Sequence, residues 1–310
     1  MENELIRWLR RRLPGDKRLK VGPGDDAAVL DLADSPDCVL TVDLLSDGVD
    51  FVLSEAGPRR VGRKALAVNL SDLAAMAARP LAAVVALLLP RHGGGQIAKE
   101  MYEGMLPLAE KYGVAMAGGD TNSWNGPLAV SITVLGAAGA RGPLRRSGAA
   151  AGDLLAVTGP LGGSILGRHL DFEPRVFEAL WLHDHIELHA GIDISDGLAL
   201  DLSRLCEESR CGAELWADRI PIHDDARRLA AAQGGRSTAD PLDHALSDGE
   251  DFELLLALPA KAMEQLTELG HGNMLHVIGR CTSEPGLRLI RPDGRSEPLE
   301  PRGWQHQLDG

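Results

Sequence analysis

Residues 64–76 read Lys-Ala-Leu-Ala-Val-Asn-Leu-Ser-Asp-Leu-Ala-Ala-Met and place one acid, Asp72, among alanines and leucines. Apolar residues dominate one face of this stretch, which predicts a long helix over about 58–79. Lys64, Val68 and Asp72 share a stripe of that helix, and Asn69 lies beside Asp72. A carboxylate in such surroundings is costly to bury unless it is paired or bound to a metal. Asp72 is therefore either a metal ligand or a solvent-facing side chain.

The elements around this helix indicate a mixed first half. Its expected helices are 3–12 and 96–112, and its expected strands are 27–30, 38–42, 49–52, 81–89, 113–117 and 128–138. The strand at 81–89 is the longest apolar run, about half the length that spans a bilayer. Between 136 and 152, Gly, Ala, Pro and Arg replace the periodic patterns and indicate a boundary.

A second series of strands and helices follows the boundary. Apolar segments are expected at 154–158, 162–169, 186–194, 213–216, 252–258, 274–279 and 287–290, with helices at 173–182, 197–209, 223–233, 239–246 and 260–269. A chain of 310 residues is longer than one typical domain. We therefore expect an α+β fold of two domains, 1–147 and 148–310.

Composition excludes several classes of protein. The formal charge of −13 argues against a nucleic-acid groove, and nothing indicates a membrane protein. No Gly-Lys dipeptide occurs, so the chain has no Walker A phosphate loop. The four cysteines show no C-x-x-C spacing and are too few for a disulfide scaffold. A reducing, cytoplasmic setting fits them best.

Short acidic turns recur along the chain, several of them after an apolar strand. They contain Asp25-Asp26, Asp43, Gly118-Gly119-Asp120, Asp193 to Asp196 and Glu250-Asp251. In open α/β sheets, ligands bind outside the carboxyl ends of strands. Each turn could also be an ordinary turn, and Ser195 or Asp196 could cap the next helix. A cap does not explain Asp193, which stands within an apolar strand.

Convergence of these acids would require bound cations. Each close pair costs on the order of 4 kcal/mol at 4 Å and an effective dielectric constant of about 20. A whole domain has only about 5–15 kcal/mol of stability. Mg²⁺ takes oxygen ligands and is commonly shared between carboxylates and substrate phosphates. The set therefore predicts a magnesium site if the acids meet.

Taken together, the motifs resemble the thiamine-monophosphate kinase family. The matching segments occur in the family's order and cover nearly the whole chain: 24–29, 41–43, 64–76, 118–121, 146–148, 193–198 and 249–251. The resemblance implies the two-domain fold of aminoimidazole ribonucleotide synthetase and a homodimer whose N-terminal domains pair their sheets. It also implies that ATP phosphorylates thiamine monophosphate to thiamine diphosphate.

The same resemblance implies a set of site residues. The implied ligands of several Mg²⁺ ions are Asp26, Thr41, Asp43, Asp72, Asp120, Asp193 and Asp196. The implied nucleotide contacts are Gly119, Asp120, Arg146, Ser195 and, more loosely, Tyr102. The implied substrate contacts are Asp50, Glu250 and Trp304. Transfer would be direct and in line, with Arg146 supporting it and no general base, because a phosphate oxygen is already deprotonated near pH 7.

The chain departs from the family pattern at four positions. Val42 stands where Thr or Ser is usual, which would remove a metal contact, and Asp50 stands where His is typical. Phe252 replaces a frequent Tyr, and Asp248 replaces a frequent Gly. Two alternatives stay open on these residues: another ATP-using enzyme of the superfamily, such as a selenophosphate or aminoimidazole ribonucleotide synthetase, or a metal-dependent binding protein without catalysis.

Overall fold

The structure is a computed structural model that describes residues 11–13, 15–21, 29–30, 37–232 and 240–305. By its internal contacts the chain forms two units. Unit 1 comprises Met1–Leu73 and Ala78–Gly142, and unit 2 comprises Ala74–Ala77 and Pro143–Gly310. No helix in the described part of the chain is both long enough and apolar enough to cross a membrane.

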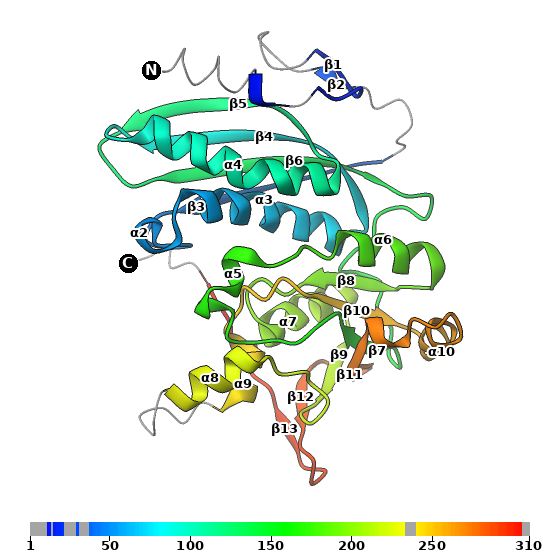
Figure 1. The fold of residues 1–310 in the computed structure, drawn as a ribbon. Coiled ribbons are helices and arrows are strands. Elements are labelled where there is room, and N and C mark those ends of the chain that lie inside the picture. The colour runs from blue at the N-terminus through cyan, green and yellow to red at the C-terminus, as the bar shows by residue number, and fades with distance from the viewer. Residues whose placement is uncertain (1–10, 14, 22–28, 31–36, 233–239, 306–310) are drawn as a thin grey trace. The chain divides into compact units, whose positions relative to one another are not determined.

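Unit 1 is built on a four-stranded sheet with the order β3-β6-β4-β5. Its strands are β3 (Cys38–Ser46), β6 (Ala129–Ala138), β4 (Ala78–Pro90) and β5 (Ala115–Trp124). β6 pairs antiparallel with β3 and β4, and β5 pairs parallel with β4. The helices α3 (Pro58–Ala75) and α4 (Gly94–Tyr112) lie along the sheet (Figure 1). The short helix α2 (Leu53–Ala56) precedes α3, and β1 (Leu19–Val21) pairs with β2 (Val29–Leu30).

Buried and exposed side chains alternate along β3 and so define the two faces of this sheet. Val39 and Leu45 are buried, while Leu40, Val42 and Leu44 are 67%, 62% and 69% exposed. Successive side chains of a strand point to opposite faces, so Thr41 and Asp43 share the face of Val39 and Leu45. We call the opposite face, which carries Leu40, Val42 and Leu44, the open face.

Unit 2 contains a seven-stranded sheet with the order β13-β12-β9-β11-β7-β10-β8. All neighbours are antiparallel except β12 and β9, which are parallel. The strands are β7 (Leu154–Val157), β8 (Ala190–Asp193), β9 (Gly212–Trp216), β10 (Leu254–Leu258), β11 (His276–Thr282), β12 (Gly286–Ile290) and β13 (Ser296–Pro298).

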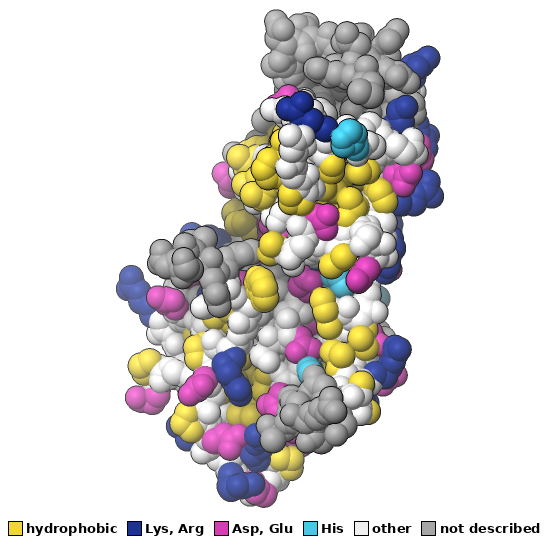
Figure 2. Space-filling view, turned by 90° about the vertical axis from the view of Figure 1, so that its left-hand side faces the viewer, with side chains coloured by type: hydrophobic (Ala, Val, Ile, Leu, Met, Phe, Trp, Pro, Cys, Tyr) yellow, Lys and Arg dark blue, Asp and Glu magenta, His cyan; other side chains and the backbone are white. Residues whose placement is uncertain are grey.

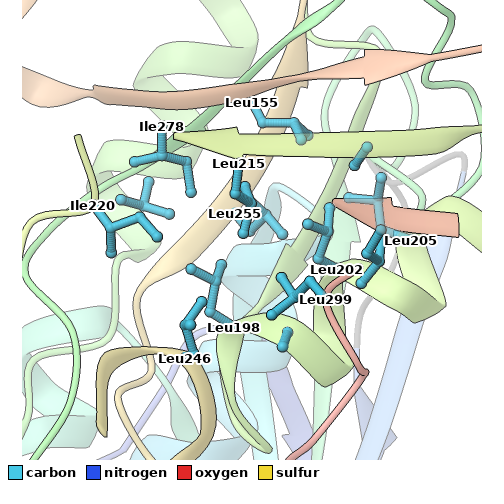
Figure 3. Close-up of a cluster of buried hydrophobic side chains, with 14 of the residues drawn as sticks. Leu155, Leu198, Leu202, Leu205, Leu215, Ile220, Leu246, Leu255, Ile278 and Leu299 are labelled. Carbon is cyan, nitrogen blue, oxygen red and sulfur yellow. The ribbon is translucent and has the colours of Figure 1, made fainter. Parts of the chain in front are cut away.

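The helical elements of unit 2 connect these strands. They are η1 (Ser164–Leu166), α5 (Arg168–Asp171), α6 (Val176–His185), α7 (Leu198–Ser209), α8 (Asp224–Ala232), α9 (Pro241–Ser247), α10 (Ala260–Glu268) and η2 (Gly272–Met274). A capping box fixes the start of α9, where Asp240 accepts from the N–H groups of Leu242 and Asp243. One apolar cluster lies between α7, α9 and the sheet, and it includes Leu198, Leu202, Leu215 and Leu255 (Figure 3).

Several expected element limits are wrong. The helix expected to reach 79 ends at Ala75, because Ala77 has a left-handed φ of 48° and β4 begins at the next residue. The strand expected at 49–52 is a turn with an isolated bridge between Asp47 and Phe51. The strands expected to end at 42 and 117 continue to Ser46 and Trp124. The apolar segment 162–169 contains η1 and the start of α5.

Other expectations are confirmed. The long helix after residue 58, the strand around 81–89 and the helix around 96–112 are all present. Gly93 and Gly113 bound α4, both in the left-handed region, and the N–H of Gly113 donates to carbonyls of the last turn. Residues 3–10 of the helix expected at 3–12 lie outside the described residues.

Candidate functional site

Asp43 in unit 1 is subject to the negative charges of two other aspartates, Asp72 and Asp50. The Thr41 hydroxyl on β3 donates to the Asp72 carboxylate on α3, which fixes the position of Asp72 beside the strand. Burial, and then the negative charges of Asp72 and Asp50, raise the pKa of Asp43 to about 7. Among the described residues, the buried Oδ2 atom of Asp43 has no hydrogen-bond partner. This arrangement is unfavourable for a bare protein and favours a bound cation.

A buried lysine holds the turn that carries Asp50. Lys64 is fully buried on α3, and its Nζ donates to the backbone oxygen of Asp50 at 2.7 Å. The Asp50 carboxylate accepts from the Ser46 N–H, also at 2.7 Å. Asp50 therefore has a local structural role in closing the turn after β3, besides its charge near Asp43.

The donor atoms of this group are of the kind that a hard divalent cation takes, although the described residues contain no group of three or more Asp, Glu, His or Cys side chains placed to hold a metal ion. Thr41, Asp43 and Asp72 offer only oxygen atoms, and Asp43 has one buried oxygen without a partner. Oxygen ligands of this kind suit Mg²⁺. Val42 lies on the open face, 62% exposed, so its replacement of Thr or Ser changes that face and not the carboxylate group.

Asp120, the other described metal candidate of unit 1, lies on the opposite face of the sheet from Asp43. Asp120 lies within β5 and pairs with Ala86, in a row that continues to Ser131 and Leu44. That row faces away from Asp43, so the structure does not place Asp120 with the three carboxylates, and its role as a ligand stays a prediction. Asp26 lies outside the described residues.

Gly119 and Tyr102 occupy confined positions in unit 1. A Cβ atom on Gly119 would lie 1.9 Å from the Val85 backbone oxygen, so the strands tolerate only glycine there. Tyr102 is 4% exposed within α4, and burial raises its pKa to about 12. The nucleotide contacts expected of both residues stay predictions.

The backbone carbonyl groups of residues 194–196 in unit 2 accept hydrogen bonds from segments that are distant in the sequence. Ile194 O accepts from Phe252 N at 2.8 Å, and Ser195 O accepts from Glu250 N at 2.7 Å. Asp196 O accepts from Trp304 N at 2.9 Å. The structure thus brings Ser195, Asp196, Glu250 and Trp304 together through backbone contacts, directly after Asp193 ends β8. Their expected roles as nucleotide, metal and substrate contacts stay predictions.

The start of α7 is organised by Asp201, which was not predicted as a site residue. The alternative that Ser195 or Asp196 caps this helix does not hold, because the N-cap is Gly197 and no side chain caps it. Instead, the Asp201 carboxylate accepts from the N–H groups of Asp196 and Gly197 at 2.9 and 3.1 Å. Burial raises the pKa of Asp201 to about 6, while the hydrogen bonds and Arg204 oppose that change.

Arg204 binds both acids of this turn. Its Nη1 lies 2.5 Å from Asp196 Oδ2 and 2.7 Å from Asp201 Oδ1. The side chain of Asp193 is buried at the end of β8, and that of Asp196 is partly exposed. Arg146 is exposed, and its backbone oxygen accepts from the Ser209 hydroxyl at 2.7 Å. The guanidinium of Arg146 is therefore accessible for a phosphate contact.

The acidic loop Asp248–Phe252 is held by the segment after β7. The N–H of Gly162 donates to both carboxylate oxygens of Asp251 at 2.9 Å, and Arg168 forms an ion pair with Asp251 at 2.8 Å. Neither Arg168 nor the role of Asp251 was predicted from the sequence. The glycine pair at 162–163 was the available signal, since a Cβ atom on Gly162 would lie 2.7 Å from the Ala245 nitrogen.

Both halves of the chain match models of known protein families. Residues 24–138 match the family model described as AIR synthase related protein, N-terminal domain. Residues 172–291 match the corresponding C-terminal domain. Together the two matches cover more than half of the chain in the order expected for a two-domain member.

Similarity to individual relatives shows which family of the AIR synthase-related proteins the chain matches. The chain is 42% identical to a thiamine-monophosphate kinase of Rhodopirellula baltica over 99% of the chain and 97% of that relative. It resembles the crystal structure of the thiamine-monophosphate kinase from Stenotrophomonas maltophilia, with a TM-score of 0.78, 33% identity, and 94% and 95% of the two chains covered. A structure of AaThiL complexed with AMPPCP and TMP matches with a TM-score of 0.77 and 26% identity, over 99% and 96%. The chain belongs to the thiamine-monophosphate kinase family, within the AIR synthase-related proteins.

Proposed function

We propose that the protein transfers the γ-phosphoryl group of ATP to thiamine monophosphate and so forms thiamine diphosphate. The observation that carries this function is the likeness to AaThiL complexed with AMPPCP and TMP, which extends over 99% of the chain. The 42% identity to a named kinase over the same length supports it. AMPPCP stands in for ATP, so the complex pairs a nucleotide with the phosphorylated acceptor.

Magnesium is the proposed partner of the carboxylates. In unit 1, the site would be formed by Thr41, Asp43 and Asp72, where the partnerless oxygen of Asp43 supports a bound cation. Asp193 and Asp196 are the corresponding candidates in unit 2, and Asp26 and Asp120 complete the proposed set. Bound Mg²⁺ would offset the charge of the two phosphorylated substrates.

The residues of the chain have distinct proposed roles in the transfer. Arg146 presents an exposed guanidinium, which suits a bidentate contact with phosphate. Ser195 contacts the nucleotide, as do Gly119, Asp120 and, more loosely, Tyr102. Glu250 and Trp304 bind the acceptor with Asp50. The acceptor oxygen needs no base, so the enzyme contributes orientation and charge compensation to a direct in-line transfer.

The proposed molecule is a cytoplasmic homodimer. Unit 1 would contribute metal and ATP binding together with dimerisation, within the expected domain 1–147. The domain 148–310 would be the C-terminal α+β domain, which carries Ser195, Glu250 and Trp304. The exposed Leu40, Val42 and Leu44 on the open face support pairing of the N-terminal sheets. Basic and acidic side chains are intermixed over the face in Figure 2, so this face has no extended basic stripe of the kind that binds nucleic acid.

One assay tests this function against the alternatives. The protein is incubated with ATP, Mg²⁺ and thiamine monophosphate, and thiamine diphosphate and ADP are quantified by chromatography. Equal amounts of the two products support the kinase. ADP without thiamine diphosphate indicates another ATP-using enzyme of the superfamily. Mg²⁺-dependent thermal stabilisation without ADP indicates a binding protein and contradicts the proposal.

A further inference from the structure

Glu250 has a backbone conformation that its residue type rarely adopts. Its φ is +53°, that of Phe252 is +52°, and Gly249 between Asp248 and Glu250 has a φ of +76°. Side chains with a Cβ atom pay a free-energy cost in this left-handed region, and such residues persist only where the surroundings hold them. Some part of the molecule must therefore hold this loop in place.

The contacts that hold the loop come from one segment about 85 residues earlier. The N–H groups of Gly162 and Gly163 donate to the carboxylates of Asp251 and Asp248 at 2.9 and 3.1 Å. The Ser164 hydroxyl donates to the Gly249 backbone oxygen at 2.8 Å. Three successive residues thus bind the loop on both sides of Glu250.

An ion pair joins the two segments a second time. Arg168 Nη2 donates to Asp251 Oδ1 at 2.8 Å and to the Gly162 backbone oxygen at 3.0 Å. Asp251 and Ser164 are 2% and 1% exposed, so water cannot readily replace these contacts. Glu250 itself stays partly exposed, at the turn where its N–H meets Ser195 O.

We infer that Ser164 and Arg168 are positioning residues that hold the Gly249–Asp251 turn so that Glu250 meets thiamine monophosphate. The inference rests on the proposed function, in which Glu250 contacts the acceptor. Neither residue was expected at the site, and neither needs to touch a substrate. Their effect passes through the backbone of Gly249 and the carboxylate of Asp251.

The substitution Ser164→Ala removes one hydrogen bond and leaves the size of the side chain nearly unchanged. A lost hydrogen bond is worth about 1 kcal/mol, which corresponds to roughly a fivefold change in an equilibrium. We expect the KM for thiamine monophosphate to rise about fivefold, with the KM for ATP unchanged. Arg168→Gln is expected to act in the same direction, and Arg168→Lys is expected to restore part of the affinity.

Ser203→Ala is the matched control. The Ser203 hydroxyl also donates to a backbone oxygen, that of Leu200 at 2.7 Å, but this bond is internal to α7 and does not join it to the acidic loop. We expect this variant to keep both KM values. Equal changes of both KM values in Ser164→Ala, or a fall in kcat alone that Ser203→Ala reproduces, would overturn the inference.

A second measurement does not depend on activity. Amide hydrogen exchange of a peptide spanning 248–253 is followed by mass spectrometry in the absence of substrates. We expect faster exchange in Ser164→Ala and wild-type exchange in Ser203→Ala, because Glu250 N–H and Phe252 N–H are hydrogen-bonded in this loop. Unchanged exchange in Ser164→Ala would refute the positioning role even if the protein phosphorylated no thiamine monophosphate.

Discussion

At the scale of single residues, Asp43 combines burial, repulsion and an oxygen without a partner. Its pKa of about 7 reflects burial first and the charges of Asp72 and Asp50 second. We expect Asp43→Asn to raise the melting temperature of the metal-free protein, because the buried charge is removed. The same variant should lose the stabilisation by Mg²⁺ and more than about tenfold in activity.

Differential scanning fluorimetry with and without Mg²⁺ checks this prediction. Asp184→Asn serves as the control, because Asp184 is an exposed acid of α6. A variant that keeps the Mg²⁺ response of the wild type would show that Asp43 is not a ligand.

His189 gives a prediction about pH that is independent of the site. Burial lowers its pKa, but the hydrogen bonds and charges of Asp153 and Glu187 outweigh that effect and raise the pKa above 6.5. A raised folded-state pKa means that the contribution of His189 to stability is complete below pH 6.5 and is lost as the pH rises through the folded-state value.

We therefore expect the excess stability of the wild type over His189→Gln to shrink between about pH 5.5 and about pH 8.5. Urea denaturation at the two pH values measures it. His276→Gln, at an exposed position of β11, is the control. A difference that grows with pH would contradict the assigned pairing with Asp153.

At the scale of elements, the periodicity of apolar residues predicted which helices and strands exist better than it predicted where they begin and end. The apolar face after residue 58 predicted α3, and the β-branched and leucine-rich run predicted β4. The ends were missed because they depend on backbone geometry, such as the left-handed Ala77 between α3 and β4. Asp43 was expected after a strand and lies within β3, since pairing with β6 extends the strand to Ser46.

The site was predictable where motifs are contiguous and was missed where contacts are distant in sequence. Asp72 stood out as an acid in an apolar helix, and Thr41 is its partner in the structure. The roles of Arg168 and Asp251 depend on a contact across 83 residues, which no local pattern encodes. Asp201 was not predicted, because its carboxylate accepts hydrogen bonds from backbone N–H groups of the preceding turn, and that contact depends on the folded backbone.

The segment after β13 carries Trp304 across the start of α7. Trp304 N donates to Asp196 O, and a Cβ atom on Gly303 would lie 2.3 Å from that same oxygen. We expect Gly303→Ala to displace the segment and to raise the KM for thiamine monophosphate, because Trp304 is a proposed acceptor contact and is 53% exposed. The melting temperature should change little, since residues 301–305 are exposed.

Steady-state kinetics with each substrate varied in turn measures the effect of Gly303→Ala. Gly95→Ala is the steric control, because a Cβ atom on Gly95 would meet nothing within 4 Å. Wild-type kinetics in Gly303→Ala would show that the position of this segment does not matter for binding.

At the scale of the whole molecule, the open face of unit 1 sets the expected assembly. β3 ends the four-stranded sheet, and Leu40, Val42 and Leu44 alternate along it, each more than 60% exposed. Burial of a leucine or valine side chain contributes about 1.5–3 kcal/mol, so leaving three of them in water is unfavourable. A second copy of the same face would cover them symmetrically.

A charged side chain placed on that face tests the predicted dimer. The wild type is expected to sediment at twice the 33.0 kDa mass of the chain, and Leu44→Glu is expected to sediment as a monomer. A carboxylate opposite its own copy would be buried against a like charge, which disfavours association. Leu269→Glu is the control, because Leu269 is 46% exposed in unit 2 and should leave the dimer intact. A Leu44→Glu protein that stays dimeric would locate the interface elsewhere, and a monomeric wild type would exclude sheet pairing altogether.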